Sequence, residues 1–390
     1  TTTCWHNMLA GQSGIRAIKR FNPGGCRTKI GGELPEEYST LEKARIPRRM
    51  FKQTLRATRL GFLCAQQAVE DSALQIEQVN PDRCAVIIGS SGAGEDDDPA
   101  RQDPSQTKFK IVREMLNALP AWISIKYGFH GRSYTVSAAD ASGSYAIGSA
   151  YALIRSGQAD LVITGGVDTL LTRHVLSRCN ALGLLAETND LPEKSSRPFD
   201  RDRTGFVLSD GGCVMILERR EHANARSARI YARLTGYGAT SRPDDGQPSE
   251  SHIEAMAHAM QQAIQDAHIP PKRIGYVNAH GLSSPTYDRW EAAALKSIFQ
   301  AQPPHVTVSA LKSMLGHTMG ACGAIACAMT ALSLTHQQVT PTINYVHPDP
   351  ECTLDNIPTK MREAPDLQAA LSNTFGLSGH NASFVVEKYV

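Results

Sequence analysis

The sequence predicts a layered α/β fold, and two observations support this prediction. Short apolar runs rich in β-forming residues alternate with longer stretches whose apolar residues recur at helical spacing. The chain is also long enough to bury a large core, because it has 390 residues, of which 41% are hydrophobic and 20% charged. Strands that alternate with helices along one chain are typical of sheets covered by helices.

Each element is predicted from its own pattern of residues. Apolar residues at helical spacing predict helices over 55–71 and 253–267, and a third helix that begins at Ser142. A cluster of Pro, Asp and Gly predicts a loop over 240–251. The runs rich in β-formers predict strands over 83–88, 133–137, 159–164, 212–217, 274–278, 305–308 and 383–388.

Composition and charge exclude several classes of function. The formal net charge is only +2, which gives no general attraction to nucleic acid or to a membrane surface. No apolar run approaches the roughly 20 residues that span a bilayer, and the first residues lack a signal-peptide pattern. The nine cysteines are scattered, with no CxxC pair and no metal-ligand spacing to histidines. We therefore expect a cytoplasmic protein with reduced thiols and no bound metal.

The segment 136–148, VSAADASGSYAIG, is the most informative part of the chain. It reads as a strand, a sharp turn and a helix, and it places Asp140 at the start of the helix. Free backbone N–H groups and the helix dipole favour negative charge at such a position. Taken alone, Asp140 is interpreted as an N-cap, which is a common role for aspartate.

This segment contains the first of four motifs, and the resemblance that these motifs carry covers nearly the whole chain. In order, they resemble the signature blocks of the β-ketoacyl-acyl-carrier-protein synthases, the elongating type of the condensing-enzyme family. The blocks are VSAADASG at 136–143, NAHGLSSP at 278–285, LKSMLGHTMGA at 311–321 and NTFGLSGHNA at 373–382.

The resemblance implies the architecture. It predicts a thiolase-like five-layered αβαβα fold made of two similar halves, residues 1–235 and 236–390. The loop over 240–251 is the candidate connection between the halves. Relatives begin with a further strand, so the first core strand is expected to be missing here. The family also implies a dimer formed through a strand near 133–137, as a homodimer or as a heterodimer with a ketosynthase paralogue.

The resemblance also implies site residues. Asp140 stands where the family has its nucleophilic cysteine, and His280 and His317 match the two catalytic histidines. Lys312 matches the lysine that organises the site electrostatically, and Glu291 a carboxylate that ties down the lysine-bearing loop. The oxyanion hole would use the backbone N–H groups of residue 140 and Leu377, with Gly376 and Gly379 supplying backbone freedom.

Departures from the family pattern concern the substrate. Leu282 stands where relatives have threonine, so one hydroxyl near the phosphopantetheine arm is missing, whereas Ser284 keeps the other. Leu377 replaces the gate phenylalanine, which either reshapes the acyl pocket or is a neutral change in an apolar wall. His380 replaces a threonine after the glycine turn and is a candidate extra acid or base.

The expected partner is an acyl carrier protein, and the substrate would be carried on its phosphopantetheine, with no other cofactor. Carrier proteins are acidic, so the basic residues Arg48, Arg49 and Lys52 are the predicted docking site, although a basic cluster is also compatible with an ordinary solvated face.

Three hypotheses follow from the aspartate. A carboxylate is a poor acyl acceptor, so normal condensation should be lost. The first hypothesis is Asp/His/His acid-base chemistry on an acyl thioester, by decarboxylation, dehydration, isomerisation or hydrolysis. The second is a non-catalytic partner that resembles a chain-length factor. The third is an ordinary synthase with an engineered Cys→Asp change.

Overall fold

The computed structural model describes residues 2–92, 110–242, 250–299, 306–352 and 354–389. Its strands are β1 (Arg16–Ala17), β2 (Ile30–Gly31), β3 (Cys84–Gly89), β4 (Ser133–Val136), β5 (Leu161–Asp168), β6 (Gly211–Glu218), β7 (Ala232–Ser241), β8 (Ile274–Asn278), β9 (Thr307–Ser309), β10 (Gln338–Val339), β11 (Arg362–Glu363), β12 (Ala369–Phe375) and β13 (His380–Lys388). Its α-helices are α1 (Thr2–Leu9), α2 (Glu37–Arg45), α3 (Arg48–Gln53), α4 (Arg56–Asp71), α5 (Lys110–Glu114), α6 (Ala118–Tyr127), α7 (Ser142–Arg155), α8 (Arg173–Ala181), α9 (Arg220–Ala225), α10 (Glu250–Asp266), α11 (Pro285–Phe299), α12 (Lys312–Leu315) and α13 (Cys322–His336).

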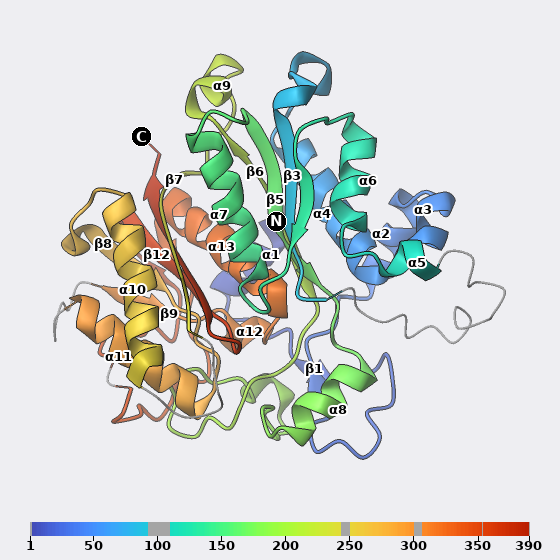
Figure 1. Cartoon of the computed structure of the whole chain (residues 1–390). Helices are drawn as coiled ribbons and strands as arrows, with labels where there is room; N and C mark the ends of the chain where they lie inside the picture. Colours follow the sequence, from blue (N-terminus) through green and yellow to red (C-terminus); the bar gives the residue numbers. More distant parts are fainter. Residues whose placement is uncertain (1, 93–109, 243–249, 300–305, 353, 390) are drawn as a thin grey trace.

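Two β-sheets alternate with three layers of helices (Figure 1). Helices α4 and α6 pack on the outer face of the first sheet, where their apolar side chains join those of β3 and β5. Helices α7 and α13 lie between the sheets, and α10 and α11 cover the outer face of the second sheet. The five-layered arrangement predicted from the sequence is confirmed.

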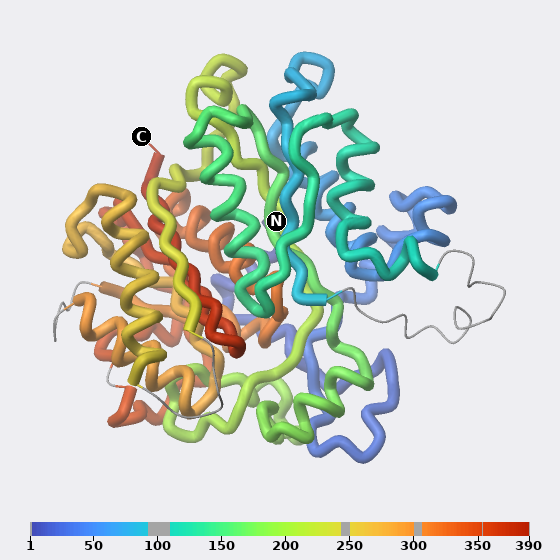
Figure 2. Tube along the Cα trace, in the orientation of Figure 1, coloured from blue at the N-terminus to red at the C-terminus, as the bar shows by residue number. Residues whose placement is uncertain are grey.

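The two sheets have similar topologies. The first has the order β4-β3-β5-β6, in which the first three strands are parallel and β6 is antiparallel. In the second, β9, β8 and β12 are parallel and β13 is antiparallel. Strand β7 extends the second sheet beside β13, as the trace in Figure 2 shows. Within the described residues, no strand occupies the equivalent place beside β6.

The chain passes from the first sheet to the second between β6 and β7. The predicted boundary between residues 235 and 236 lies within β7, which pairs with β13. The loop predicted over 240–251 therefore joins β7 to α10 inside the second half and does not join the halves. Loop composition marks a turn in the chain without revealing which elements the turn connects. Residues 243–249 of this loop lie outside the described part.

Three glycines form the seam between the halves. A Cβ atom on Gly143 of α7 would lie 2.7 Å from the carbonyl oxygen of Gly320, and one on Gly166 of β5 would lie 2.5 Å from the same oxygen. Real Cβ atoms do not approach backbone so closely, so only glycine allows these segments to touch. The seam brings the N-terminal end of α7 close to the segment that precedes α13.

Among the described residues, one helical stretch, Met319–His336, is long and apolar enough to cross a membrane. In this fold, 67% of it is buried, because α13 is packed between the two sheets. Its apolar composition is therefore explained by its place in the core.

Candidate active site

The site lies where the N-terminal end of α7 meets loops of the second half. Asp140 ends the turn that follows β4, and the residue before it, Ala139, has a φ of +46°. That conformation is rare for a residue with a side chain, and such strain is concentrated at functional sites. The side chains of Asp140, His280 and His317 are buried there, with no more than 2% of any of them exposed.

Asp140 is not the N-cap that the local sequence predicts. The N-cap position belongs to Ala141, and within the described part of the chain no side-chain capping hydrogen bond is made there. The Asp140 side chain turns away from the helix, and its Oδ2 accepts a hydrogen bond of 2.8 Å from the backbone N–H of Leu377. The Asp140 side chain therefore binds a backbone N–H that is 237 residues away in sequence, and it does not bind the N–H groups that begin its own helix.

Asp140 and His317 form a buried ion pair. Their Oδ1 and Nε2 atoms lie 3.4 Å apart. Burial opposes ionisation of Asp140, but the charge of His317, the N–H of Leu377 and the charge of Lys312 together lower its pKa below the usual value. Burial alone would lower the pKa of His317, yet Asp140 raises it to about 9. At neutral pH the pair is therefore a carboxylate beside an imidazolium.

His280 has the opposite electrostatic environment. The Lys312 Nζ lies 3.1 Å from His280 Nδ1 and donates to the His280 carbonyl oxygen at 2.6 Å. Burial and the charges of Lys312 and His317 hold the pKa of His280 well below its usual value. Because Lys312 has only protons to donate, Nδ1 must accept, so the proton of the neutral ring is on Nε2. That Nε2 is buried and has no hydrogen-bond partner among the described residues.

Glu291 holds the histidine loop. Its two carboxylate oxygens accept hydrogen bonds from the backbone N–H groups of His280 and Gly281, at 2.8 and 2.7 Å. The expected contact was with the loop that carries Lys312, so the structure corrects which loop this side chain fixes directly. Burial raises the pKa of Glu291 to about 7, against the opposing effect of the two N–H donors.

The turn over 376–379 lies against Asp140. One hydrogen bond lies within the turn, from the Gly379 N–H to the Gly376 carbonyl oxygen at 2.9 Å. Another, from the Gly376 N–H to the carbonyl oxygen of His380 at 2.8 Å, joins the turn to the first residue of β13. Gly379 has a φ of +78°, which explains why this position is glycine. The turn thus presents the Leu377 N–H to the carboxylate.

Three other predicted residues lie around this centre. Leu282 is 1% exposed and packs in an apolar cluster with Phe206, which gives it a core role. The backbone carbonyl of Ser284 accepts a hydrogen bond from the buried Arg203. His380 is half-buried, and its ring hydrogen-bonds the Ser378 hydroxyl and lies edge-on against Tyr145.

Sequence reasoning missed several neighbours of the site. The Cys322 thiol donates to the carbonyl oxygen of Asp140 at 3.4 Å, and the ring of Phe206 lies edge-on to His317 with centroids 5.1 Å apart. The Tyr287 hydroxyl donates to the carbonyl oxygen of Leu377 at 3.1 Å. Cys322 follows His317 by five residues and comes directly after the signature block 311–321, which was an available signal; Tyr287 has no such signal beyond its place near His280.

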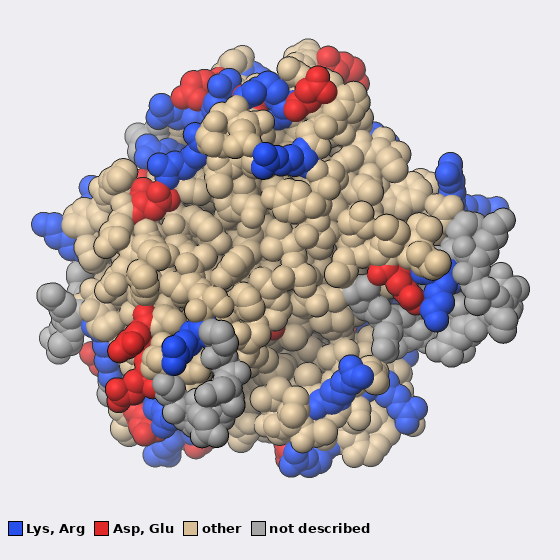
Figure 3. All heavy atoms as spheres, in the orientation of Figure 1, with Lys and Arg blue, Asp and Glu red and all other residues tan. Residues whose placement is uncertain are grey.

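The predicted docking residues are exposed. Arg48, Arg49 and Lys52 lie on α3, at the edge of the molecule where Figure 3 shows basic side chains on the right. Two other basic residues nearby are paired: Arg45 with Glu70 and the buried Arg59 with Glu42. Arg45 is exposed but paired with Glu70, so the docking site is best represented by the exposed side chains of α3.

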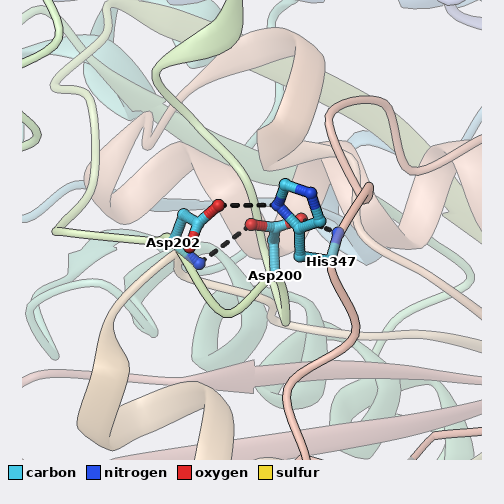
Figure 4. Close-up of side chains that lie close together, drawn as sticks. All are labelled: Asp200, Asp202 and His347. Carbon is cyan, nitrogen blue, oxygen red and sulfur yellow. Dashed lines mark hydrogen bonds and ion pairs between the residues drawn. The ribbon is translucent and has the colours of Figure 1, made fainter.

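A group of three possible metal ligands, Asp200, Asp202 and His347, lies outside this site (Figure 4). The Asp200 oxygens accept backbone N–H groups of Asp202, Val346 and His347. His347 Nδ1 lies 2.7 Å from Asp202, and Arg197 already places a positive charge within 4 Å of both carboxylates. These contacts identify the group as a structural link between two loops.

Comparisons with known proteins agree with this geometry. Residues 1–223 match the model of the beta-ketoacyl synthase N-terminal domain, and residues 231–346 match the model of its C-terminal domain. The chain is 35% identical over 402 residues to 3-oxoacyl-[acyl-carrier-protein] synthase 2 of Staphylococcus aureus, covering 99% of this chain and 94% of that protein. The chain therefore belongs to the beta-ketoacyl synthase family.

Solved structures show the same fold. The ishigamide ketosynthase/chain length factor matches with a TM-score of 0.88 and 29% identity, over 100% of this chain and 95% of that one. A type II polyketide synthase acyl-carrier protein in complex with its ketosynthase matches with a TM-score of 0.84 and 27% identity, over 99% and 94%. The predicted thiolase-like fold of two similar halves is confirmed.

Proposed function

We propose that the protein decarboxylates a malonyl-type thioester on an acyl carrier protein, without an acyl-enzyme. One observation carries this proposal: at neutral pH the two histidines of the site offer N–H groups, and its carboxylate is already paired. Asp140 is ionised and paired, His317 is protonated, and the acceptor nitrogen of His280 faces Lys312. Dehydration, isomerisation and base-assisted hydrolysis each need a free base, whereas decarboxylation needs only stabilisation of the enolate.

In the proposed step, the bond between the malonyl carboxylate and the methylene carbon breaks and CO₂ leaves. The bonding electron pair forms an enolate, whose oxygen is stabilised by N–H groups of His280 and His317. The His317 imidazolium then gives its proton to the carbon, which produces an acetyl thioester, and solvent restores that proton. The balance is malonyl thioester plus one proton to acetyl thioester plus CO₂.

Asp140 supports this step without covalent chemistry. By family resemblance it occupies the nucleophile position, and a carboxylate does not form a stable acyl-enzyme from a thioester. Its Oδ2 also occupies the Leu377 N–H, where an acyl oxygen would bind. The Asp140 carboxylate therefore takes the place that the acyl oxygen of an acyl-enzyme would occupy, and its charge keeps His317 protonated.

Mass spectrometry of carrier-bound thioesters tests the proposal. The protein should convert malonyl-carrier to acetyl-carrier and leave β-ketoacyl- and β-hydroxyacyl-carriers unchanged. Asp140→Asn should slow this conversion roughly 100- to 1,000-fold, and Asp140→Cys should introduce condensation. Unchanged malonyl-carrier would refute the proposal, and full condensation by the cysteine variant without native decarboxylation would support an ordinary synthase with a changed residue.

The proposed partner is an acidic acyl carrier protein that docks on α3. The exposed Arg48, Arg49 and Lys52 provide the positive charge for such a partner, and one structural relative is a ketosynthase in complex with its carrier. Charge reversal at Arg48 and Arg49 should slow turnover of carrier thioesters and spare malonyl-pantetheine, whereas reversal at the exposed Arg219 and Arg220 should change neither. We place both proteins in the cytoplasm.

A second candidate is a partner subunit of an active ketosynthase. One face of the molecule, over α7, β4 and α6, carries few charged side chains (Figure 3). The edge strand β4 lies on it, and Ile125 of α6 is 71% exposed. One structural relative is named a ketosynthase/chain length factor. Co-expression with a ketosynthase paralogue distinguishes the two: a stable heterodimer with no decarboxylation by this chain favours the second candidate, and an active homodimer favours the first.

A further inference from the structure

The buried histidine pair is closed to solvent in this structure. His280 is 2% exposed and His317 is fully buried. A thioester must reach both rings in the proposed reaction, so part of the covering structure has to move. The question is which part moves and what holds it.

The turn over 376–379 lies directly against Asp140. A Cβ atom placed on Gly376 would lie 3.7 Å from the Cβ of Asp140 and 3.7 Å from the backbone nitrogen of Ala141, so the turn packs against the segment that begins α7. Ser378, at the tip of the turn, is exposed, and Leu377 is half-buried. The turn therefore spans the distance between the solvent and the carboxylate.

The hydrogen bonds of this turn separate into internal and external ones. The bond from Gly379 to Gly376 holds the turn together as a unit, and the bond from Gly376 to His380 joins that unit to the start of β13. The external bonds at Leu377 are two: the N–H donates to Asp140, and the carbonyl oxygen accepts from the Tyr287 hydroxyl at 3.1 Å. At the other end, the Gly379 carbonyl accepts from Arg242, next to the paired strands β7 and β13, which suits a hinge.

We propose that Tyr287 is a positioning residue that latches this turn over the histidine pair. While its hydroxyl holds the Leu377 carbonyl, the turn is closed and the Leu377 N–H stays on Asp140; release of the hydroxyl opens the path for the acyl thioester. The role in substrate entry depends on the proposed function, whereas the latch itself does not.

Tyr287 is well placed for this role. It lies in the first turn of α11, a helix of 15 residues, and its ring packs against Trp290 with centroids 5.0 Å apart. The ring is therefore held in place independently of the hydroxyl. Tyr287→Phe should remove the hydrogen bond and keep the packing.

Hydrogen–deuterium exchange of the unliganded protein tests the latch. In Tyr287→Phe, peptides containing Leu377 should exchange roughly three- to tenfold faster, as expected for loss of one hydrogen bond. Tyr145→Phe is the matched control, because the Tyr145 hydroxyl donates to the Thr240 carbonyl and its ring touches His380, without bonding Leu377. Equal exchange in the wild type and Tyr287→Phe, or the same acceleration in both variants, would overturn the proposal.

Kinetics with malonyl-pantetheine test the role in entry. In Tyr287→Phe, the turn should be open in a larger fraction of the molecules, so KM should fall by about the same factor as exchange accelerates. The kcat should stay nearly unchanged, because the contacts of Tyr287 given above are with Leu377 and Trp290 and not with a histidine ring. A lower kcat with unchanged KM would overturn this role. If the wild type does not decarboxylate, the proposed function fails, and the exchange experiment still decides whether the latch exists.

Discussion

His280 and His317 are the same side chain in the same buried site, with ring centroids 5.8 Å apart, yet at neutral pH His280 is neutral and His317 is protonated. A lysine faces His280 and lowers its pKa, whereas a carboxylate faces His317 and raises its pKa to about 9. Burial acts in the same direction on both. The difference shows that one neighbouring charge decides whether a buried histidine is a neutral donor or an acid.

The strongest test of this contrast removes the negative charge beside His317. Asp140→Asn should lower the pKa of His317 strongly, because burial lowers that pKa and the carboxylate that outweighs burial would be gone, with only the smaller effect of Cys322 still raising it. Both histidines would be neutral at pH 7, and malonyl decarboxylation should fall roughly 100- to 1,000-fold. Histidine NMR titration and carrier turnover measure these effects. Asp266→Asn, which breaks a surface pair with Arg155, is the control and should change neither.

The second test removes the positive charge beside His280. Lys312→Met should raise the pKa of His280 and free its Nδ1, so that the proton no longer stays on Nε2. Decarboxylation should fall about 10- to 100-fold. The exposed Lys296→Met on α11 serves as the control for loss of a lysine. If His280 titrated as before in Lys312→Met, the lysine would not be the cause of its low pKa.

A third test uses the dependence of stability on pH. The pKa of His317 is 6.5 in an unfolded chain and about 9 in the fold, so the native state binds more protons between these values. The stabilisation is fully present below pH 6.5 and is lost as the pH rises to 9, by at most about 1.4 kcal/mol per pH unit. Urea unfolding at several pH values should show this decline. The decline should be absent in Asp140→Asn and retained in His347→Gln, which alters an exposed pair.

The smallest expected effect comes from the carboxylate that supports the His280 loop. In Glu291→Gln, an amide NH₂ group replaces one of the two carboxylate oxygens and faces a backbone N–H of the His280 loop. The free energy of unfolding should therefore fall by roughly 1 to 2 kcal/mol. The pKa of His317 should stay near its wild-type value, because Glu291 binds the other loop. Glu351→Gln, at an exposed pair with Arg289, should cost less than about 1 kcal/mol. Equal losses in the two variants would contradict the structural role of Glu291.

Much of the fold could be predicted from local patterns. The strand predicted over 274–278 coincides with β8, and that over 212–217 lies within β6. The helix predicted from Ser142 begins at that residue. Strands β7 and β12 were not predicted, because their residues show no strict alternation of apolar and polar side chains.

The sequence predicted which residues form the site, but it did not predict the contacts that these residues make. Asp140, His280, His317 and Lys312 come together as the motifs indicate. The direction in which Asp140 turns depends on a backbone N–H 237 residues away, which no local rule supplies. The Tyr287 contact was missed for the same reason.

The glycine seam between the halves has a consequence for motion. Gly143, Gly166 and Gly320 allow backbone to rest directly on backbone, with no side chains between to slide or rotate. A joint of this kind resists shear, so the two halves should behave as a single rigid body throughout a reaction cycle. Movements that admit a substrate must then occur in peripheral loops, and cutting or rejoining the chain at the seam is the change this molecule should tolerate least.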